Sequence, residues 1–153
     1  LLRVSPLSWL IFGVNDVPLV GGTFARLRQY RFVKHILDGG LHRGRLSAPL
    51  AREFYDVGNR PGHPRAFASL VHHWPSWEEE RERYGDIRVP VLLLYGNHDW
   101  SRPDERAETA RRIPGASSHT VDSAGHFLSF DAPEDVIPRV VEFVDRVPAR
   151  LTS

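Results

Sequence analysis

Two side chains that could pass a proton between them follow strand-like apolar segments in the second half of the chain. Asp99 stands near the end of VPVLLLYGNHDW, residues 89–100, and His126 stands within VDSAGHFLSFDAPEDV, residues 121–136. The residues between them predict one helix and one short strand, the connection that adjacent parallel strands require. Catalytic groups gather at the carboxyl ends of such strands. We therefore expect a pair in which the carboxylate fixes the tautomer of the imidazole, and the imidazole moves the proton of a nucleophile or water.

The tetrapeptide at residues 96–99, G-N-H-D, allows a second chemistry. It resembles a ligand block of the calcineurin-like metal-dependent phosphoesterases, with Asn97 as a metal ligand. Two cations about 3.5–4 Å apart need several such blocks. No D-x-H motif stands upstream, Gly85-Asp86 lacks the second Asp of G-D-x-x-D, and no second histidine follows His126 closely. The metallophosphoesterase is therefore a distant alternative, and we expect neither a metal nor any other cofactor.

The two segments, together with the amphipathic pattern that ends the chain, resemble the C-terminal part of an α/β-hydrolase with a helical cap. The order along the chain in that family is nucleophile, acid, histidine. The resemblance makes Asp99 the acid and His126 the base. It implies an α/β fold class, namely a partial α/β-hydrolase fold with the C-terminal three parallel strands, their helices and a helical cap. The implied parts are the end of a core strand (residues 1–5), a cap or lid region (6–88) and the C-terminal part of the core (89–153).

The nucleophile that such a triad needs is missing from this sequence. No G-x-S-x-G or G-x-D-x-G motif occurs, and Ser117 in GASSH enters a predicted strand instead of leaving one for a helix. We therefore expect the chain to be an inactive fragment of a parent hydrolase. A serine would make the parent an esterase or lipase that hydrolyses a small apolar ester or lipid, and an aspartate would make it an epoxide hydrolase or dehalogenase. A non-catalytic remnant that binds a ligand or partner is the remaining alternative.

Three residues beside the predicted pair are candidates for the substrate pocket. His98 and Trp100 flank Asp99, and Phe127 follows His126. The aromatic rings could shape an apolar pocket, although packing under the cap explains them equally well. His98 could also be a simple neighbour of the acid.

Asp131 allows two interpretations. As the first residue before the closing helix it could be the N-cap, with Glu134 completing a capping box. With His126 it also forms an H-x-x-x-x-D pattern, which resembles a motif of the phospholipid-acting branch of the superfamily. We expect the capping role.

The apolar pattern predicts helices before Pro90 and alternating strands and helices after it. A helical pattern ends at Gly39-Gly40, and Ser47 with Pro49 predicts the start of the next helix. After Pro90 the expected elements are a strand at 91–96, a helix at 102–113, a strand at 117–123 and a closing helix from Asp131. Pro138 is unfavourable inside that closing helix, by roughly 3 kcal/mol.

Composition favours a single globular domain. The 153 residues, 41 % of them apolar, suffice for a buried core. Because 20 basic and 19 acidic residues give a net charge of only +1, we expect a small, neutral partner and not nucleic acid. The absence of cysteine excludes a disulfide scaffold.

The start of the sequence bears on its completeness. The chain contains no methionine, so we expect that an N-terminal part is missing. The apolar stretch Leu7–Val14 is far shorter than the roughly 20 residues that span a bilayer, so no membrane span is expected. The cytoplasm is the favoured compartment, and the oligomeric state is open. An incomplete sheet would leave an unpaired edge, so we expect the isolated chain to self-associate.

Overall fold

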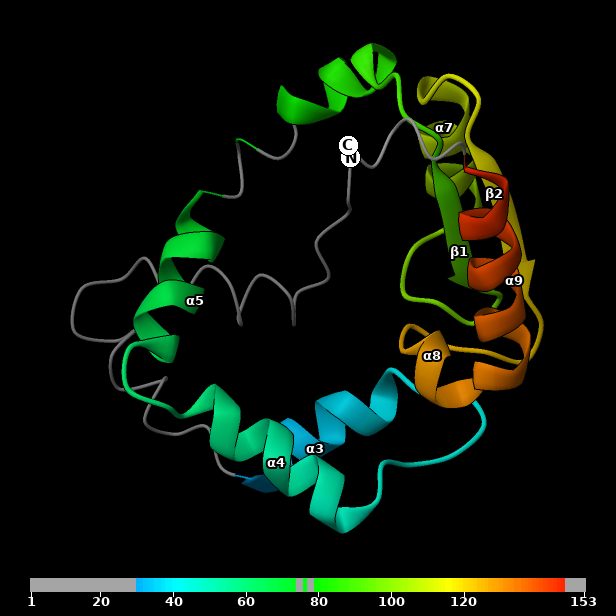
Figure 1. The fold of residues 1–153 in the computed structure, drawn as a ribbon. Helices are drawn as coiled ribbons and strands as arrows, with labels where there is room; N and C mark the ends of the chain where they lie inside the picture. Colours follow the sequence, from blue (N-terminus) through cyan, green and yellow to red (C-terminus); the bar gives the residue numbers. More distant parts are fainter. Residues whose placement is uncertain (1–29, 74–75, 77–78, 148–153) are drawn as a thin grey trace. The chain divides into compact units, whose positions relative to one another are not determined.

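The computed structural model of the chain describes residues 30–73, 76 and 79–147 (Figure 1). The described residues form two compact units. Residues 30–36 belong with those from 46 to 79, and residues 37–45 belong with those from 80 onward. The predicted strand at residues 1–5 lies outside the described residues. Within them, no helix combines the length and apolar character that a bilayer crossing requires.

The first unit is built from short helices. They are α3 (Tyr30–Gly39, whose last residues belong to the second unit), α4 (Ala48–Gly58) and α5 (His63–His72). Helix α3 ends at Gly39, as the Gly-Gly pair predicted. The Oγ of Ser47 accepts a hydrogen bond from the Leu50 N–H at 3.4 Å, so the predicted N-cap of α4 is confirmed. Local signals therefore account for the end of α3 and the start of α4.

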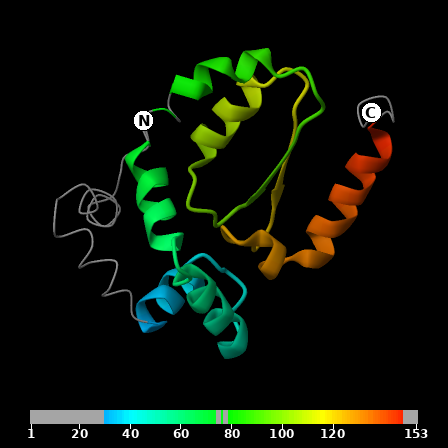
Figure 2. The same ribbon diagram turned by 60° about the vertical axis from the view of Figure 1, so that its left-hand side comes forward.

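The second unit alternates strands and helices. Its elements are η2 (Arg81–Asp86), β1 (Leu92–Gly96), α7 (Pro103–Arg112), β2 (Ser117–Val121), α8 (Leu128–Asp131) and α9 (Pro133–Arg146). Strands β1 and β2 pair in parallel, with Leu92 opposite Ser117 and Gly96 opposite Val121. Helices α7 and α9 lie on opposite sides of this pair (Figure 2). The predicted crossover from strand through helix to neighbouring strand is confirmed.

The core of this unit lies where the strands end. Val121, Ala124 and Ala132 are buried, and Leu128 and Val136 pack against them. The segment that follows β2 therefore packs against apolar side chains.

Gly96 permits the close approach of this backbone to β1. A Cβ atom at residue 96 would lie 2.1 Å from the carbonyl oxygen of Ala124 and 2.4 Å from that of Gly125. Real Cβ contacts do not reach such distances, so only glycine fits at the end of β1.

The expected cap of the closing helix is wrong. Helix α9 begins at Pro133 after Ala132, and no side chain caps it. Asp131 instead ends the short helix α8, and its carboxylate accepts backbone N–H groups outside α9, from Gly125 and from the distant residues His42 and Arg43. Pro138 lies inside α9, so the helix accommodates the residue that was expected to be unfavourable.

Candidate active site

The turn after β1 presents Asp99. The N–H of Asp99 donates to the Gly96 carbonyl at 3.2 Å, which forms a tight turn at the carboxyl end of the strand. The Asp99 side chain is only 7 % exposed. Its Oδ1 accepts hydrogen bonds from the N–H and the hydroxyl of Ser101, both at 2.6 Å. Its Oδ2 is left for a partner in the loop that follows the next strand.

That partner is His126, in the loop after β2. Its Nδ1 lies 3.2 Å from Oδ2 of Asp99. The imidazole is 42 % exposed, whereas the carboxylate is buried. Among the described residues, the one hydrogen bond of the imidazole is this contact at Nδ1. The structure thus brings together the two residues that the sequence singled out, and it leaves the second ring nitrogen available to a reactant.

The environment of Asp99 favours its ionised form. Burial raises the pKa of the carboxyl, but the hydroxyl and N–H of Ser101 and the neighbouring His126 outweigh burial, so the net pKa lies below the usual value. The group is therefore a carboxylate at neutral pH. A carboxylate at Nδ1 stabilises an imidazolium when Nε2 takes up a proton.

Two of the three predicted pocket residues lie at His126. The Trp100 indole stacks on the imidazole with centroids 4.2 Å apart and planes 16° apart. Phe127 meets both rings edge to face. His98 is placed differently, since its ring stacks on that of His42 at 3.6 Å. Trp100 and Phe127 therefore flank the imidazole, and His98 has a separate aromatic partner.

The sequence interpretation missed the segment after α3. The Phe127 N–H donates to the Gly40 carbonyl at 3.0 Å, and the Trp100 indole N–H donates to the Gly39 carbonyl at 3.3 Å. A Cβ at Gly125 would lie 2.5 Å from the Gly40 oxygen. A Cβ at Gly40 would lie 2.5 Å from the ring of Phe127, so the absence of side chains at Gly40 and Gly125 allows this backbone to approach the loop of the candidate histidine.

Asp131 was also misjudged. Its Oδ2 accepts the N–H groups of His42 and Gly125, each at 2.7 Å, and its Oδ1 accepts the Arg43 N–H at 2.9 Å. The H-x-x-x-x-D spacing singled out the residue, but no local rule identifies partners 88 and 89 residues away.

The residues of the G-N-H-D turn have other partners. The Asn97 amide donates to an oxygen of Asp122 at 3.4 Å. Within the described part of the chain, no group of three or more His, Cys, Asp or Glu side chains is placed to hold a metal ion.

Comparison with known proteins identifies the fold. No protein-family model matches the chain. It is 38 % identical over 60 residues to the carboxylesterase YbfK of Bacillus subtilis. This match covers 38 % of this chain and 20 % of that protein. It is 34 % identical over 98 residues to the sn-1-specific diacylglycerol lipase ABHD11 of Mus musculus. This match covers 62 % of this chain and 31 % of that protein. The chain thus spans less than a third of either relative.

Solved structures agree with the sequence relatives. Cfl2 from Burkholderia cenocepacia superposes with a TM-score of 0.74 at 18 % identity, over 94 % of this chain and 51 % of that one. The carboxylesterase CesB (YbfK) superposes with a TM-score of 0.58 at 22 % identity, over 84 % of this chain and 46 % of that one. The relatives and structural neighbours are α/β-hydrolases, and this chain carries part of that fold. The family resemblance and the fold class predicted from the sequence are confirmed.

Proposed function

We propose that this chain supplies the acid and the base of a serine-type α/β-hydrolase that cleaves a small apolar ester or lipid. Asp99 is the acid and His126 is the base. The nucleophile belongs to a part of the parent protein that this sequence does not contain. The observation that carries the proposal is the 3.2 Å contact between Nδ1 of His126 and the buried carboxylate of Asp99.

The geometry supports a definite division of work. The carboxylate accepts the Nδ1–H of His126 and so leaves Nε2 unprotonated. Nε2 then takes the proton of a serine hydroxyl as the hydroxyl oxygen attacks the ester carbonyl, and it returns that proton to the leaving alkoxide. The lowered pKa of Asp99 keeps its negative charge opposite the imidazolium formed between these steps. Ser101 supports the acid by holding its other oxygen.

The surroundings of the base favour an apolar substrate. Trp100 and Phe127 place aromatic rings against His126. The names of the relatives, a carboxylesterase and a diacylglycerol lipase, agree with this class. The cap assignment of residues 6–88 stays a prediction, and within it residues 37–45 pack in the same unit as Asp99 and His126.

The test begins with the coding sequence that precedes Leu1 in frame. We expect it to encode a strand, a G-x-S-x-G motif and a helix. The parent protein should hydrolyse p-nitrophenyl butyrate, and the Asp99→Asn and His126→Ala variants should each lose about 10⁴-fold in kcat. Asp104→Asn is the matched control, since Asp104 is an exposed carboxylate paired with Arg102.

Other outcomes would overturn the proposal. Full activity of Asp99→Asn would remove the acid from its assigned role. A G-x-D-x-G motif with turnover of an epoxide would instead select the aspartate-nucleophile alternative. Activity that disappears with a chelator and returns with manganese would select the metallophosphoesterase. A start codon directly before Leu1, with no hydrolysis by the purified chain, would select the non-catalytic remnant.

A further inference from the structure

We propose that Arg43 is a positioning residue for His126, because its guanidinium fixes the backbone of the loop that carries the imidazole. This loop, residues 122–126, is called the histidine loop below. The inference rests on the proposed function for its catalytic meaning. The structural part can be tested on the chain itself.

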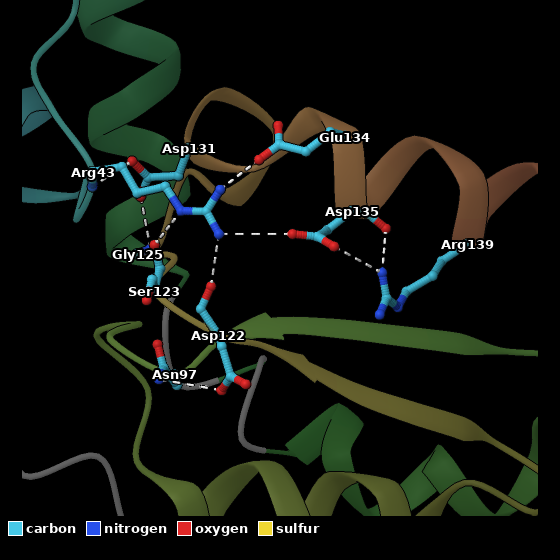
Figure 3. Close-up of polar contacts among 9 residues, drawn as sticks. All are labelled: Arg43, Asn97, Asp122, Ser123, Gly125, Asp131, Glu134, Asp135 and Arg139. Carbon is cyan, nitrogen blue, oxygen red and sulfur yellow. Dashed lines mark hydrogen bonds and ion pairs between the residues drawn. The ribbon is translucent and has the colours of Figure 1, made fainter.

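Arg43 holds the histidine loop through two consecutive carbonyl groups. Its Nε donates to the Ser123 oxygen at 2.8 Å, and its Nη2 donates to the Asp122 oxygen at 3.0 Å (Figure 3). The planar guanidinium presents both N–H groups in a fixed fork, so the two carbonyls must keep a set relative orientation.

Ser123 makes such a constraint necessary. Among the described residues other than glycine, Ser123 alone has a positive φ, at 55°. An L-residue pays roughly 1–2 kcal/mol in that region, so the loop needs outside contacts to select it. The fork of Arg43 supplies them on both sides of Ser123, through the carbonyls of the peptides that precede and follow it.

Arg43 is itself anchored at the start of α9. Its Nη1 donates to Oε1 of Glu134 at 2.5 Å, and its Nη2 lies 3.7 Å from Oδ2 of Asp135 (Figure 3). Its backbone N–H is held by Asp131. The guanidinium is 35 % exposed, so it bridges the histidine loop and α9 at the protein surface.

The remaining residues of the loop are held from other directions. The Ala124 oxygen accepts the His98 N–H at 2.9 Å, the Gly125 N–H donates to Asp131, and the Phe127 N–H donates to Gly40. From residue 122 to 127, every residue except 126 thus offers a backbone group to a partner outside the loop. Arg43 provides two of these five contacts. The ring of His126 is then oriented by its contact with Asp99 and by its packing against Trp100 and Phe127.

Arg43 does not touch a reacting atom, so its effect acts through the placement of His126. Misplacing a catalytic group by about 1 Å can cost about 10²-fold in rate. The Arg43→Lys variant retains the charge facing Glu134 and Asp135 but lacks the planar fork. It separates the loss of loop geometry from the loss of an ion pair.

The first experiment is NMR on the chain itself. In the wild type, Arg43 should show a resolved, slowly exchanging Nε–H, and His126 should be the Nδ1–H tautomer. In Arg43→Lys, the Gly125 and Phe127 amides should exchange about tenfold faster relative to those of β1, and the Nδ1–H signal should broaden. The β1 amides serve as the reference for global unfolding.

Arg139→Lys is the matched control. Arg139 also lies on the surface and pairs with Asp135, but it makes no contact with the histidine loop. Loop exchange equal to that of Arg139→Lys would overturn the positioning role. An averaged, fast-exchanging Arg43 Nε–H in the wild type would overturn it as well, even if the lysine variant does not fold.

The second experiment uses the parent enzyme. Arg43→Lys should lower kcat about tenfold and leave KM unchanged, because substrate contacts are not altered. A change in KM alone would contradict the inference. If the parent shows no hydrolysis, the proposed function fails, while the exchange experiment still decides whether Arg43 orders the histidine loop.

Discussion

Removing the charge of Asp131 should destabilise the protein more than removing the charge of an exposed carboxylate does. This carboxylate is 8 % exposed and accepts three backbone N–H groups, those of His42, Arg43 and Gly125. Asp131→Asn keeps the size of the side chain but retains one acceptor oxygen. The amide nitrogen must then face at least one N–H donor, and that donor loses its partner.

The magnitude follows from the number of bonds. A hydrogen bond to a charged group contributes about 1.5–3 kcal/mol, and a buried group left without a partner costs about 1–3 kcal/mol. One lost bond and two weakened ones give an expected loss of about 2–4 kcal/mol in the free energy of unfolding for Asp131→Asn. An exposed ion pair contributes only about 0–1 kcal/mol, so Asp104→Asn should stay within that range.

The same substitution should change the dependence of stability on pH. Burial raises the pKa of Asp131, but the N–H groups of His42, Gly125 and Arg43 outweigh burial and set the net pKa below its usual value. A lowered pKa gives stability that is fully present above the unfolded-state pKa of about 3.9 and lost as the pH falls through the folded-state pKa. The gap between the wild type and Asp131→Asn should therefore be constant above about pH 5 and close below about pH 4.

Urea denaturation between pH 3 and pH 7 measures both effects on the wild type, Asp131→Asn and Asp104→Asn. A loss below 0.5 kcal/mol at pH 7 would refute the assignment of three bonds to a charged carboxylate, since even one such bond contributes about 1.5 kcal/mol. A gap that stays unchanged down to pH 3 would refute the role of ionisation.

Three further predictions concern other sites. Gly96→Ala should lower the free energy of unfolding, measured by urea denaturation, by about 1–3 kcal/mol, because its Cβ would overlap with backbone atoms. Gly85→Ala, with open space around it, should lower it by less than about 1 kcal/mol, and equal losses would contradict this reasoning. Val141→Lys on the apolar face of α9, where Val141 is 53 % exposed, should reduce self-association in sedimentation velocity, and an unchanged profile would exclude this face as the contact. Ser101→Ala should raise the pKa of Asp99, followed by carboxyl ¹³C NMR, because it removes a hydroxyl that lowers that pKa; no change would argue against the 2.6 Å bond.

Much of the second unit could be predicted because the signals are local. A run of apolar residues before Gly96 indicates a parallel strand, although Leu92–Tyr95 are only partly buried, and the breaker at Pro114-Gly115 separates α7 from β2. With both strands assigned, the proximity of Asp99 and His126 follows because both residues come after the carboxyl ends of neighbouring parallel strands. The structure gives these two residues the expected proximity, and their catalytic role remains a proposal.

The contacts that hold the histidine loop could not be predicted because their partners are distant in the sequence. Arg43 reaches carbonyls 79 and 80 residues away and a carboxylate 91 residues away. Asp131 was assigned to a helix cap because the capping rule considers only the next three residues. In the structure, tertiary donors outcompete that local use of the carboxylate.

The distribution of these contacts explains why the site spans two distant stretches of the chain. Strand β2 brings His126 to the edge of the sheet where Asp99 lies, but Ser123 and Gly125 then lie outside any helix or strand. That path is held by Arg43, Asp131 and the Gly40 carbonyl, and two of these three come from the segment after α3. Residues 37–45 therefore contribute contacts to the backbone on both sides of His126, in addition to the sheet that brings His126 close to Asp99.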